Sequence, residues 1–256
     1  MEDYKKEVFC PQCRGFIKPK IVKVPTFTGE VIIEYHCPKH GLIEVEKRPM
    51  KLPARKLPKE GLYIAFEGID GSGKTTQTIL FNEYLKIKGY ETVLVKEPWI
   101  KAIKEFLYKY DVDPDAEAYI FAADRIILQK EIVLPALEKR KIVVSDRSIY
   151  ASLAYQGARG LDEEFILAIN RHIRHPDVVI LLDLPVEEAL DRIVTRSVRT
   201  RFEDPDFMKK VRQRYLEIAQ KYKDNFIVVD ASKPVREIHR TIIELVKKKI
   251  GGKIHL

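Results

Sequence analysis

The chain has 256 residues, of which 45% are hydrophobic and 33% are charged, and its formal net charge is +8. That length suits one large domain with a small additional unit, and no apolar run is long enough to cross a membrane. The charged N-terminal segment Met1–Glu7 lacks the apolar core of a secretion signal, so we expect a cytoplasmic protein with anionic partners, either nucleotides or nucleic acid.

The N-terminal unit, residues 1–50, contains all three cysteines of the protein. They fall, with one histidine, in two segments of similar form, Cys10-Pro-Gln-Cys13 and Cys37-Pro-Lys-His40. Each segment places two ligands in a tight turn, which suits Zn²⁺ held tetrahedrally by three thiolates and one imidazole. His36 is an alternative fourth ligand, but the repeated spacing favours His40. We predict a structural zinc ribbon; a pair of reduced turns without metal is the alternative.

Residues 51–60 are basic and contain prolines, which indicates a linker to a second domain, residues 61–256. This domain alternates apolar strands with helices. Strands are predicted at 62–66, 92–96, 141–145, 177–184 and 226–230, besides one at 31–35 in the first unit. Helices are predicted at 74–88, 100–110, 114–139, from 149, from 162, from 186, and at 207–223 and 235–249. The pattern predicts an α/β fold of three layers, with a five-stranded parallel sheet covered on both faces.

A phosphate-binding loop, Gly68-Ile-Asp-Gly-Ser-Gly73-Lys74-Thr75, separates the first of these strands from its helix. Its glycines let backbone N–H groups point at phosphate oxygens, and the new helix directs its positive end at the same anion. Lys74 would reach the β- and γ-phosphates, and Thr75 would bind Mg²⁺. The expected ATP-binding residues are Gly68, Ile69, Asp70, Gly71, Ser72, Gly73, Lys74, Thr75 and Thr76. A structural glycine turn is the alternative.

From about Leu62 to Val246 the sequence resembles the thymidylate kinase family, a group of P-loop nucleoside monophosphate kinases. Four segments carry the resemblance: Phe66–Gln77, Phe121-Ala-Ala-Asp-Arg125, Asp146-Arg147-Ser148 followed by Ser152–Gly157, and the arginine-rich stretch Arg192–Arg201. It implies a P-loop NTPase fold, ATP and Mg²⁺ as cofactors, dTMP as acceptor, and a homodimer.

The resemblance also implies residues that bind the acceptor. Asp70 would contact the sugar 3′-hydroxyl, and Phe121 would stack on the base. Arg125 would hydrogen-bond the carbonyl edge of the base. Tyr155 would crowd the sugar 2′ position, and Gln156 would help to bind the base. The alternative for Phe121 and Arg125 is a core ring beside a surface cation.

The remaining implied roles concern the phosphates. Arg147 would clamp the acceptor phosphate and Asp146 would hold a Mg²⁺-bound water, although a local ion pair is the alternative. A mobile lid would supply the catalytic cation from Arg196 or Arg201, because Gly71 stands where some family members carry a loop arginine. An ordinary solvated helix end is the alternative for the lid.

Three departures from the family pattern flank the acceptor site. Ser148 replaces the usual Tyr, Ala151 replaces a usual Ser, and the segment Lys96–Trp99 lacks the Gly-Gly-Thr that normally follows it. Glu97 in that segment still lies where it would serve the acceptor or Mg²⁺.

The sequence therefore predicts phosphorylation of dTMP to dTDP by ATP with Mg²⁺. A kinase for another monophosphate such as dUMP is the nearest alternative. An alternative from another class is a nucleotide-dependent nucleic-acid-binding protein that uses the zinc ribbon.

Overall fold

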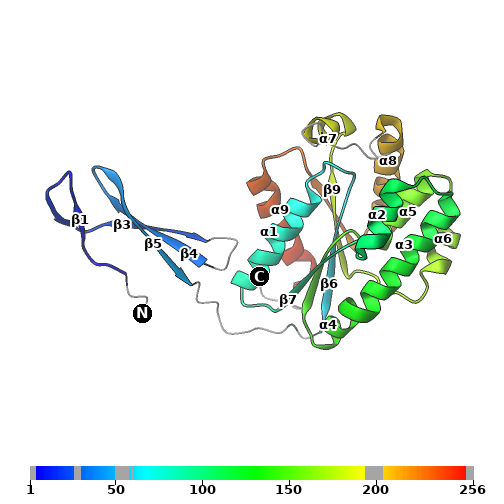
Figure 1. The fold of residues 1–256 in the computed structure, drawn as a ribbon, viewed down its shortest axis with the longest axis horizontal. Coiled ribbons are helices and arrows are strands. Elements are labelled where there is room, and N and C mark those ends of the chain that lie inside the picture. The colour runs from blue at the N-terminus through cyan, green and yellow to red at the C-terminus, as the bar shows by residue number, and fades with distance from the viewer. Residues whose placement is uncertain (1–3, 26–29, 50–57, 59, 194–203, 252–256) are drawn as a thin grey trace. The chain divides into compact units, whose positions relative to one another are not determined.

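A computed structural model describes residues 4–25, 30–49, 58, 60–193 and 204–251 (Figure 1). The chain divides into two compact units, Met1–Pro53 and Ala54–Leu256. Among the described helices, none has the length and apolar character that a bilayer crossing requires.

The first unit consists of two small antiparallel sheets. One pairs β1 (Val8–Cys10) with β2 (Gly15–Ile17), and the other has the order β3 (Lys20–Pro25), β4 (Glu30–Cys37), β5 (Gly41–Pro49). Its small core gathers around buried Val8, Ile33 and Tyr35. The sequence predicted only the middle strand of the larger sheet, because its neighbours alternate with many charged residues.

The second unit is built on a sheet of five parallel strands in the order β10-β9-β6-β8-β7. The strands are β6 (Leu62–Glu67), β7 (Thr92–Lys96), β8 (Ile142–Asp146), β9 (Val178–Asp183) and β10 (Phe226–Asp230). The central strands β6 and β8 are buried along their whole length, as a parallel sheet with two covered faces requires. The predicted fold class is confirmed.

Helices lie on both sides of this sheet, with α1 and α9 on one side and α2, α3, α5 and α6 on the other (Figure 1). The bounds are α1 (Lys74–Ile87), α2 (Lys101–Lys109), α3 (Pro114–Leu128), α4 (Leu134–Glu138), α5 (Ile149–Ala158), α6 (Glu163–Ile169), α7 (Val186–Ile193), α8 (Pro205–Lys221) and α9 (Val235–Lys249). Phe66 of β6 packs on Phe81 of α1, with ring centroids 5.7 Å apart. On the opposite face Tyr63, Val95 and Val143 pack together with residues of the helix that follows α3.

The prediction of one regular helix over residues 114–139 is wrong in detail. A π-helical turn, η1 (Gln129–Val133), separates α3 from α4. Pro135 lies just beyond this turn, and its ring in a regular α-helix would clash with the carbonyl group of residue 131. The wider turn accommodates the proline without ending the helix.

Candidate functional site

The turn between β6 and α1 has a backbone that only glycine adopts readily. Gly68, Gly71 and Gly73 have φ angles of 141°, 82° and 88°. A Cβ atom on Gly71 would lie 2.4 Å from the carbonyl oxygen of Ala189, and one on Gly68 would lie 2.6 Å from that of Leu182. No side chain caps the first turn of α1, so its N–H groups are left for an anion.

Lys74, the first residue of α1, folds back over this turn. Its Nζ donates to the carbonyl oxygen of Ile69 at 2.7 Å and lies 3.7 Å from Oδ1 of Asp70. Burial, together with the positive charge of Arg147, lowers the pKa of Lys74 to about 8. The lysine is therefore held in a poorly solvated position, where an anion would restore its charge.

The C-terminal ends of β7 and β8 bring a cation and a carboxylate together, because Lys96 and Asp146 are register partners. Nζ of Lys96 lies 2.8 Å from Oδ2 of Asp146 and 3.1 Å from Oγ1 of Thr75, and the Thr75 hydroxyl donates to Oδ2 at 2.5 Å. Burial raises the pKa of Asp146, but Lys74 and Lys96 outweigh it and hold that pKa below 3.8. The other oxygen, Oδ1, is buried with no partner among the described residues.

Arg147 follows β8 with a φ of 79°, an unusual value for a residue with a side chain. Its Nη2 donates to Oδ1 of Asp70 at 2.6 Å and to the hydroxyl of Tyr155 at 3.2 Å. The guanidinium lies over the Tyr155 ring, 4.8 Å from its centroid, and Nη1 is 3.5 Å from the hydroxyl of Tyr215. These contacts fix a cation beside the phosphate-binding loop.

Glu67, for which the sequence predicted no role, is fully buried near Arg147. It accepts hydrogen bonds from Ser148 at 2.7 Å and from Tyr215 at 2.8 Å. Burial raises the pKa of Glu67 to about 7, although both hydrogen bonds and Arg147 oppose the rise. A charged residue that ends an apolar strand was the available signal.

The segment with Phe121 and Arg125 lies on α3. Arg125 is fully buried and Phe121 is partly buried. Arg125 donates from Nε to Glu97 at 2.9 Å, from Nη1 to Asn170 at 2.8 Å and from Nη2 to Ser152 at 2.9 Å. Burial, only partly offset by Arg125, raises the pKa of Glu97. The surface-cation alternative for Arg125 is therefore wrong, whereas its predicted contact with a base stays a prediction.

Gln156 on α5 is 2% exposed, and its Nε2 donates to Oε1 of Glu117 at 2.8 Å. The other oxygen of Glu117 accepts from Nη1 of Arg159 at 2.7 Å. No role for Glu117 or Arg159 was predicted from the sequence. The available signal was spacing, because Glu117, Phe121 and Arg125 recur every four residues along one face of α3.

One cavity of about 1070 Å³ extends along the phosphate-binding loop, the C-terminal ends of β7 and β8, and helices α3 and α5. It is lined by the phosphate-binding loop from Asp70 to Thr76, by Glu97, Phe121, Arg125, Asp146, Arg147, Tyr155 and Gln156, and by Ser232–Val235. Two predicted ATP-binding residues, Gly68 and Ile69, do not line it: the first supports the turn and the second is buried in the core. The predicted lid cations Arg196 and Arg201 lie outside the described residues. Arg192 borders the cavity and donates to the carbonyl oxygen of Ala231.

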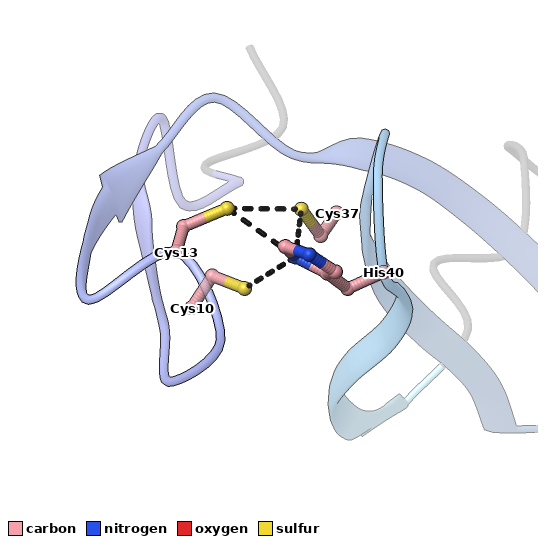
Figure 2. Close-up of side chains that lie close together, drawn as sticks. All are labelled: Cys10, Cys13, Cys37 and His40. Atoms are coloured by element: carbon pink, nitrogen blue, oxygen red, sulfur yellow. Dashed lines mark hydrogen bonds between the residues drawn. The ribbon is translucent and has the colours of Figure 1, made fainter.

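A separate cluster lies in the first unit, where Cys10, Cys13, Cys37 and His40 converge (Figure 2). Nδ1 of His40 is 3.5, 3.3 and 3.6 Å from the three sulfurs in that order, and the sulfurs of Cys13 and Cys37 are 3.8 Å apart. Tetrahedral Zn²⁺ with ordinary bond lengths requires S···N edges of about 3.5 Å and S···S edges of about 3.8 Å. The alternative ligand His36 instead contacts Glu34 at 2.9 Å.

The electrostatics of Cys37 also suit a metal, whereas burial and hydrogen bonds with Cys10 and Cys37 raise the pKa of the Cys13 thiol to about 11. The backbone N–H groups of Lys39 and His40 point at the sulfur of Cys37 and lower the pKa of its thiol to about 6. A thiolate is the form in which cysteine binds metal. The four side chains therefore fit a closed tetrahedral site.

Comparison with known proteins assigns the second unit. The family model described as thymidylate kinase matches residues 66–242. A probable thymidylate kinase of Thermococcus gammatolerans is 40% identical over 204 residues, which cover 74% of this chain and 98% of that protein. A probable thymidylate kinase of Methanocaldococcus jannaschii is 44% identical over 191 residues, 73% of this chain and 97% of that protein. The thymidylate kinase of Kosmotoga olearia is 36% identical over 205 residues, 74% of this chain and 99% of that protein.

Proposed function

The chain belongs to the thymidylate kinase family, and we propose that its second unit transfers the γ-phosphoryl group of ATP to dTMP, giving ADP and dTDP. The observation that carries this proposal is one cavity that is lined both by the phosphate-binding loop and by Phe121 and Arg125. We infer that the loop forms the donor end and Phe121 with Arg125 the acceptor end, so that the two bound nucleotides would face each other.

At the donor end the N–H groups of the loop and of the first turn of α1 would bind the β- and γ-phosphates, with Lys74 as their cation. Ser232–Val235, which border the same cavity, would lie beside the adenine. The uncapped start of α1 and the poorly solvated ammonium group both favour an anion at this place.

Thr75 and Asp146 are the residues that would hold Mg²⁺, Thr75 directly and Asp146 through water. They fit this role, because the ammonium group of Lys96 already contacts Oγ1 of Thr75 and Oδ2 of Asp146. The other oxygen of Asp146, Oδ1, has no partner among the described residues. When bound, Mg²⁺ neutralises charge on the β- and γ-phosphates.

At the acceptor end Arg147 would bind the phosphate of dTMP, and Asp70 would bind the 3′-hydroxyl. The ring of Tyr155 packs against the guanidinium of Arg147, and Tyr155 would crowd a 2′-hydroxyl. A phosphate oxygen of dTMP attacks the γ-phosphorus, and the bond to the β–γ bridging oxygen breaks to release ADP. The attacking oxygen is already anionic at neutral pH, so alignment and charge neutralisation replace a general base.

The cation that stabilises the transferring phosphoryl group would come from the lid, as Arg196 or Arg201. The phosphate-binding loop cannot supply this cation, because Gly71 stands where some family members carry an arginine. A side chain at position 71 would collide with Ala189. Closure of the lid would also exclude water and limit hydrolysis of ATP.

Replacing Lys74 with Ala tests the mechanism. We expect loss of dTMP-dependent ADP formation by at least about a thousandfold, with an unchanged circular dichroism spectrum. Lys101→Ala is the matched control, because Lys101 is an exposed lysine on α2. Near-normal turnover in Lys74→Ala would refute the mechanism.

For the first unit we propose a structural Zn²⁺ bound by Cys10, Cys13, Cys37 and His40. Purified protein should contain one zinc per chain, and Cys13→Ser should release it while dTMP kinase activity persists. Retention of stoichiometric zinc by that variant would contradict the proposed ligand set. The resemblance to the family further leads us to propose a homodimer, which light scattering of the full chain would test.

A second candidate function, nucleic-acid binding by the first unit, is favoured by one observation. Phe9 and Phe16 are 50% and 72% exposed, and their rings pack edge to face with centroids 5.5 Å apart. Exposed rings on a ribbon with positive charge are suited to stacking with unpaired bases. Fluorescence anisotropy with single-stranded oligonucleotides tests this function, and equal binding by Phe9→Ala/Phe16→Ala would contradict it.

A further inference from the structure

A buried carboxylate links the surface of the protein to the wall of the cavity. Glu117 on α3 is fully buried and contacts two side chains of the neighbouring helix region. On one side Arg159 donates to Oε2 of Glu117 at 2.7 Å and also holds the carbonyl oxygen of Val112 at 3.1 Å. On the other side Gln156 donates to Oε1 of Glu117 at 2.8 Å.

This arrangement determines which end of the Gln156 amide is available to a ligand. A carboxylate paired with a guanidinium has only acceptors, so it must be met by the NH₂ group of the amide and not by its oxygen. Oε1 of Gln156 is consequently left on the other side of the group. It is buried without a partner among the described residues, although Gln156 lines the cavity.

A buried acceptor that lacks a donor requires one from a ligand, because leaving it unpaired is costly. Thymine and uracil carry a donor, N3–H, between two carbonyl groups, whereas cytosine carries an acceptor at N3 and a donor at N4. Arg125 completes the pattern from the facing helix, since one N–H of its Nη1 has no acceptor among the described residues after Asn170 is counted. Gln156 and Arg125 line the same cavity, and an acceptor from one with a donor from the other would match thymine or uracil and oppose cytosine.

We propose that Glu117 is a positioning residue that sets base selectivity: it fixes the Gln156 amide so that Oε1 accepts the N3–H of thymine or uracil and rejects cytosine. This inference rests on the proposed function of the cavity. Arg159 contributes to the same selectivity, because its guanidinium keeps the carboxylate of Glu117 in place. It does not separate thymine from uracil, which present the same edge.

The decisive variant is Glu117→Gln, which nearly preserves shape but removes the acceptor-only character of residue 117. The amide of Gln156 then turns over freely and presents either oxygen or NH₂ to the base. We expect the ratio of kcat/KM for dTMP to that for dCMP to fall by at least about tenfold. The ratio of the dissociation constant for dCMP to that for dTMP, measured by calorimetry without ATP, should fall alongside it.

The exchange variant Glu117→Gln/Gln156→Glu keeps the charge of the cluster and provides a rescue. A carboxylate at position 156 has only acceptors, so selectivity for dTMP over dCMP should return whichever way the new amide turns. Glu131→Gln is the matched control, because Glu131 is an exposed carboxylate on η1 and should leave the ratio unchanged.

The outcomes separate this inference from the function on which it rests. Failure of the unaltered protein to phosphorylate dTMP would overturn the proposed function. Normal selectivity in the unaltered protein together with an unchanged dTMP/dCMP ratio in Glu117→Gln would overturn the role of Glu117, even if both rates fell. If Glu117→Gln does not fold, the exchange variant decides: retained selectivity supports the inference and lost selectivity contradicts it.

Discussion

Binding of ATP should be accompanied by uptake of protons, because Lys74 is held partly uncharged in the free protein. Burial and the nearby charge of Arg147 lower its pKa from 10.5 to about 8. Triphosphate oxygens at the loop would raise this pKa again by stabilising the ammonium form. The free protein therefore binds fewer protons than the complex over the interval between the two pKa values.

The magnitude follows from the pKa of about 8. At pH 8 about half of the Lys74 side chains are neutral, so binding should take up about 0.5 proton, against about 0.1 at pH 7 and about 0.9 at pH 9. Linkage then requires the affinity for ATP to fall about tenfold between pH 7 and pH 9, or about 1.4 kcal/mol.

Titration calorimetry with a non-hydrolysable ATP analogue, in buffers of different ionisation enthalpy, measures the proton uptake directly. Arg147→Met removes one cause of the lowered pKa and should shift the uptake to higher pH. Lys101→Met, on an exposed lysine, should leave it unchanged. Binding at pH 8 without proton uptake would refute the reasoning about Lys74.

Two further predictions concern the buried carboxylate of Glu67 and the proposed Mg²⁺ site at Thr75 and Asp146. Burial raises the pKa of Glu67 from 4.5 to about 7, so the folded state favours its protonated form. The free energy of unfolding should therefore fall by up to about 3 kcal/mol as the pH rises from 4.5 to 7. Glu67→Gln, which can still bond to Tyr215, should remove that part of the pH dependence in denaturant titrations. An equal slope of unfolding free energy against pH in both proteins would contradict this prediction. Lys96→Met should tighten binding of Mn²⁺ in the presence of ADP by about threefold or more, because the ammonium group no longer competes for Thr75 and Asp146. Electron paramagnetic resonance measures this affinity. Weaker binding would contradict the prediction and show that Lys96 assists the metal.

The sequence was sufficient to predict the second unit because its signals are local. Each strand is a short apolar run, and the boundaries of β7 and α9 agree with the predicted residues 92–96 and 235–249. The phosphate-binding loop was equally clear, since glycine adopts the positive φ angles that the structure shows at Gly71 and Gly73 far more readily than other residues do.

Contacts between distant segments could not be predicted in this way. Glu117 and Arg159 are 42 positions apart, and charged residues on helices usually indicate a solvated face. Likewise Arg125 is predicted from the family pattern, but its burial among Glu97 and Asn170 depends on three separate elements meeting. Tertiary packing decides which charges are buried, and single-sequence patterns do not contain that information.

The central claim, one cavity that aligns ATP with a thymine deoxynucleotide, is tested most directly by one acceptor panel. ADP formation from Mg·ATP should be measured with dTMP, dUMP, CMP, GMP, AMP and single-stranded RNA. We predict the highest kcat/KM with dTMP and no stimulation by RNA. A higher kcat/KM with dUMP or a purine monophosphate, or stimulation by RNA alone, would contradict the claim.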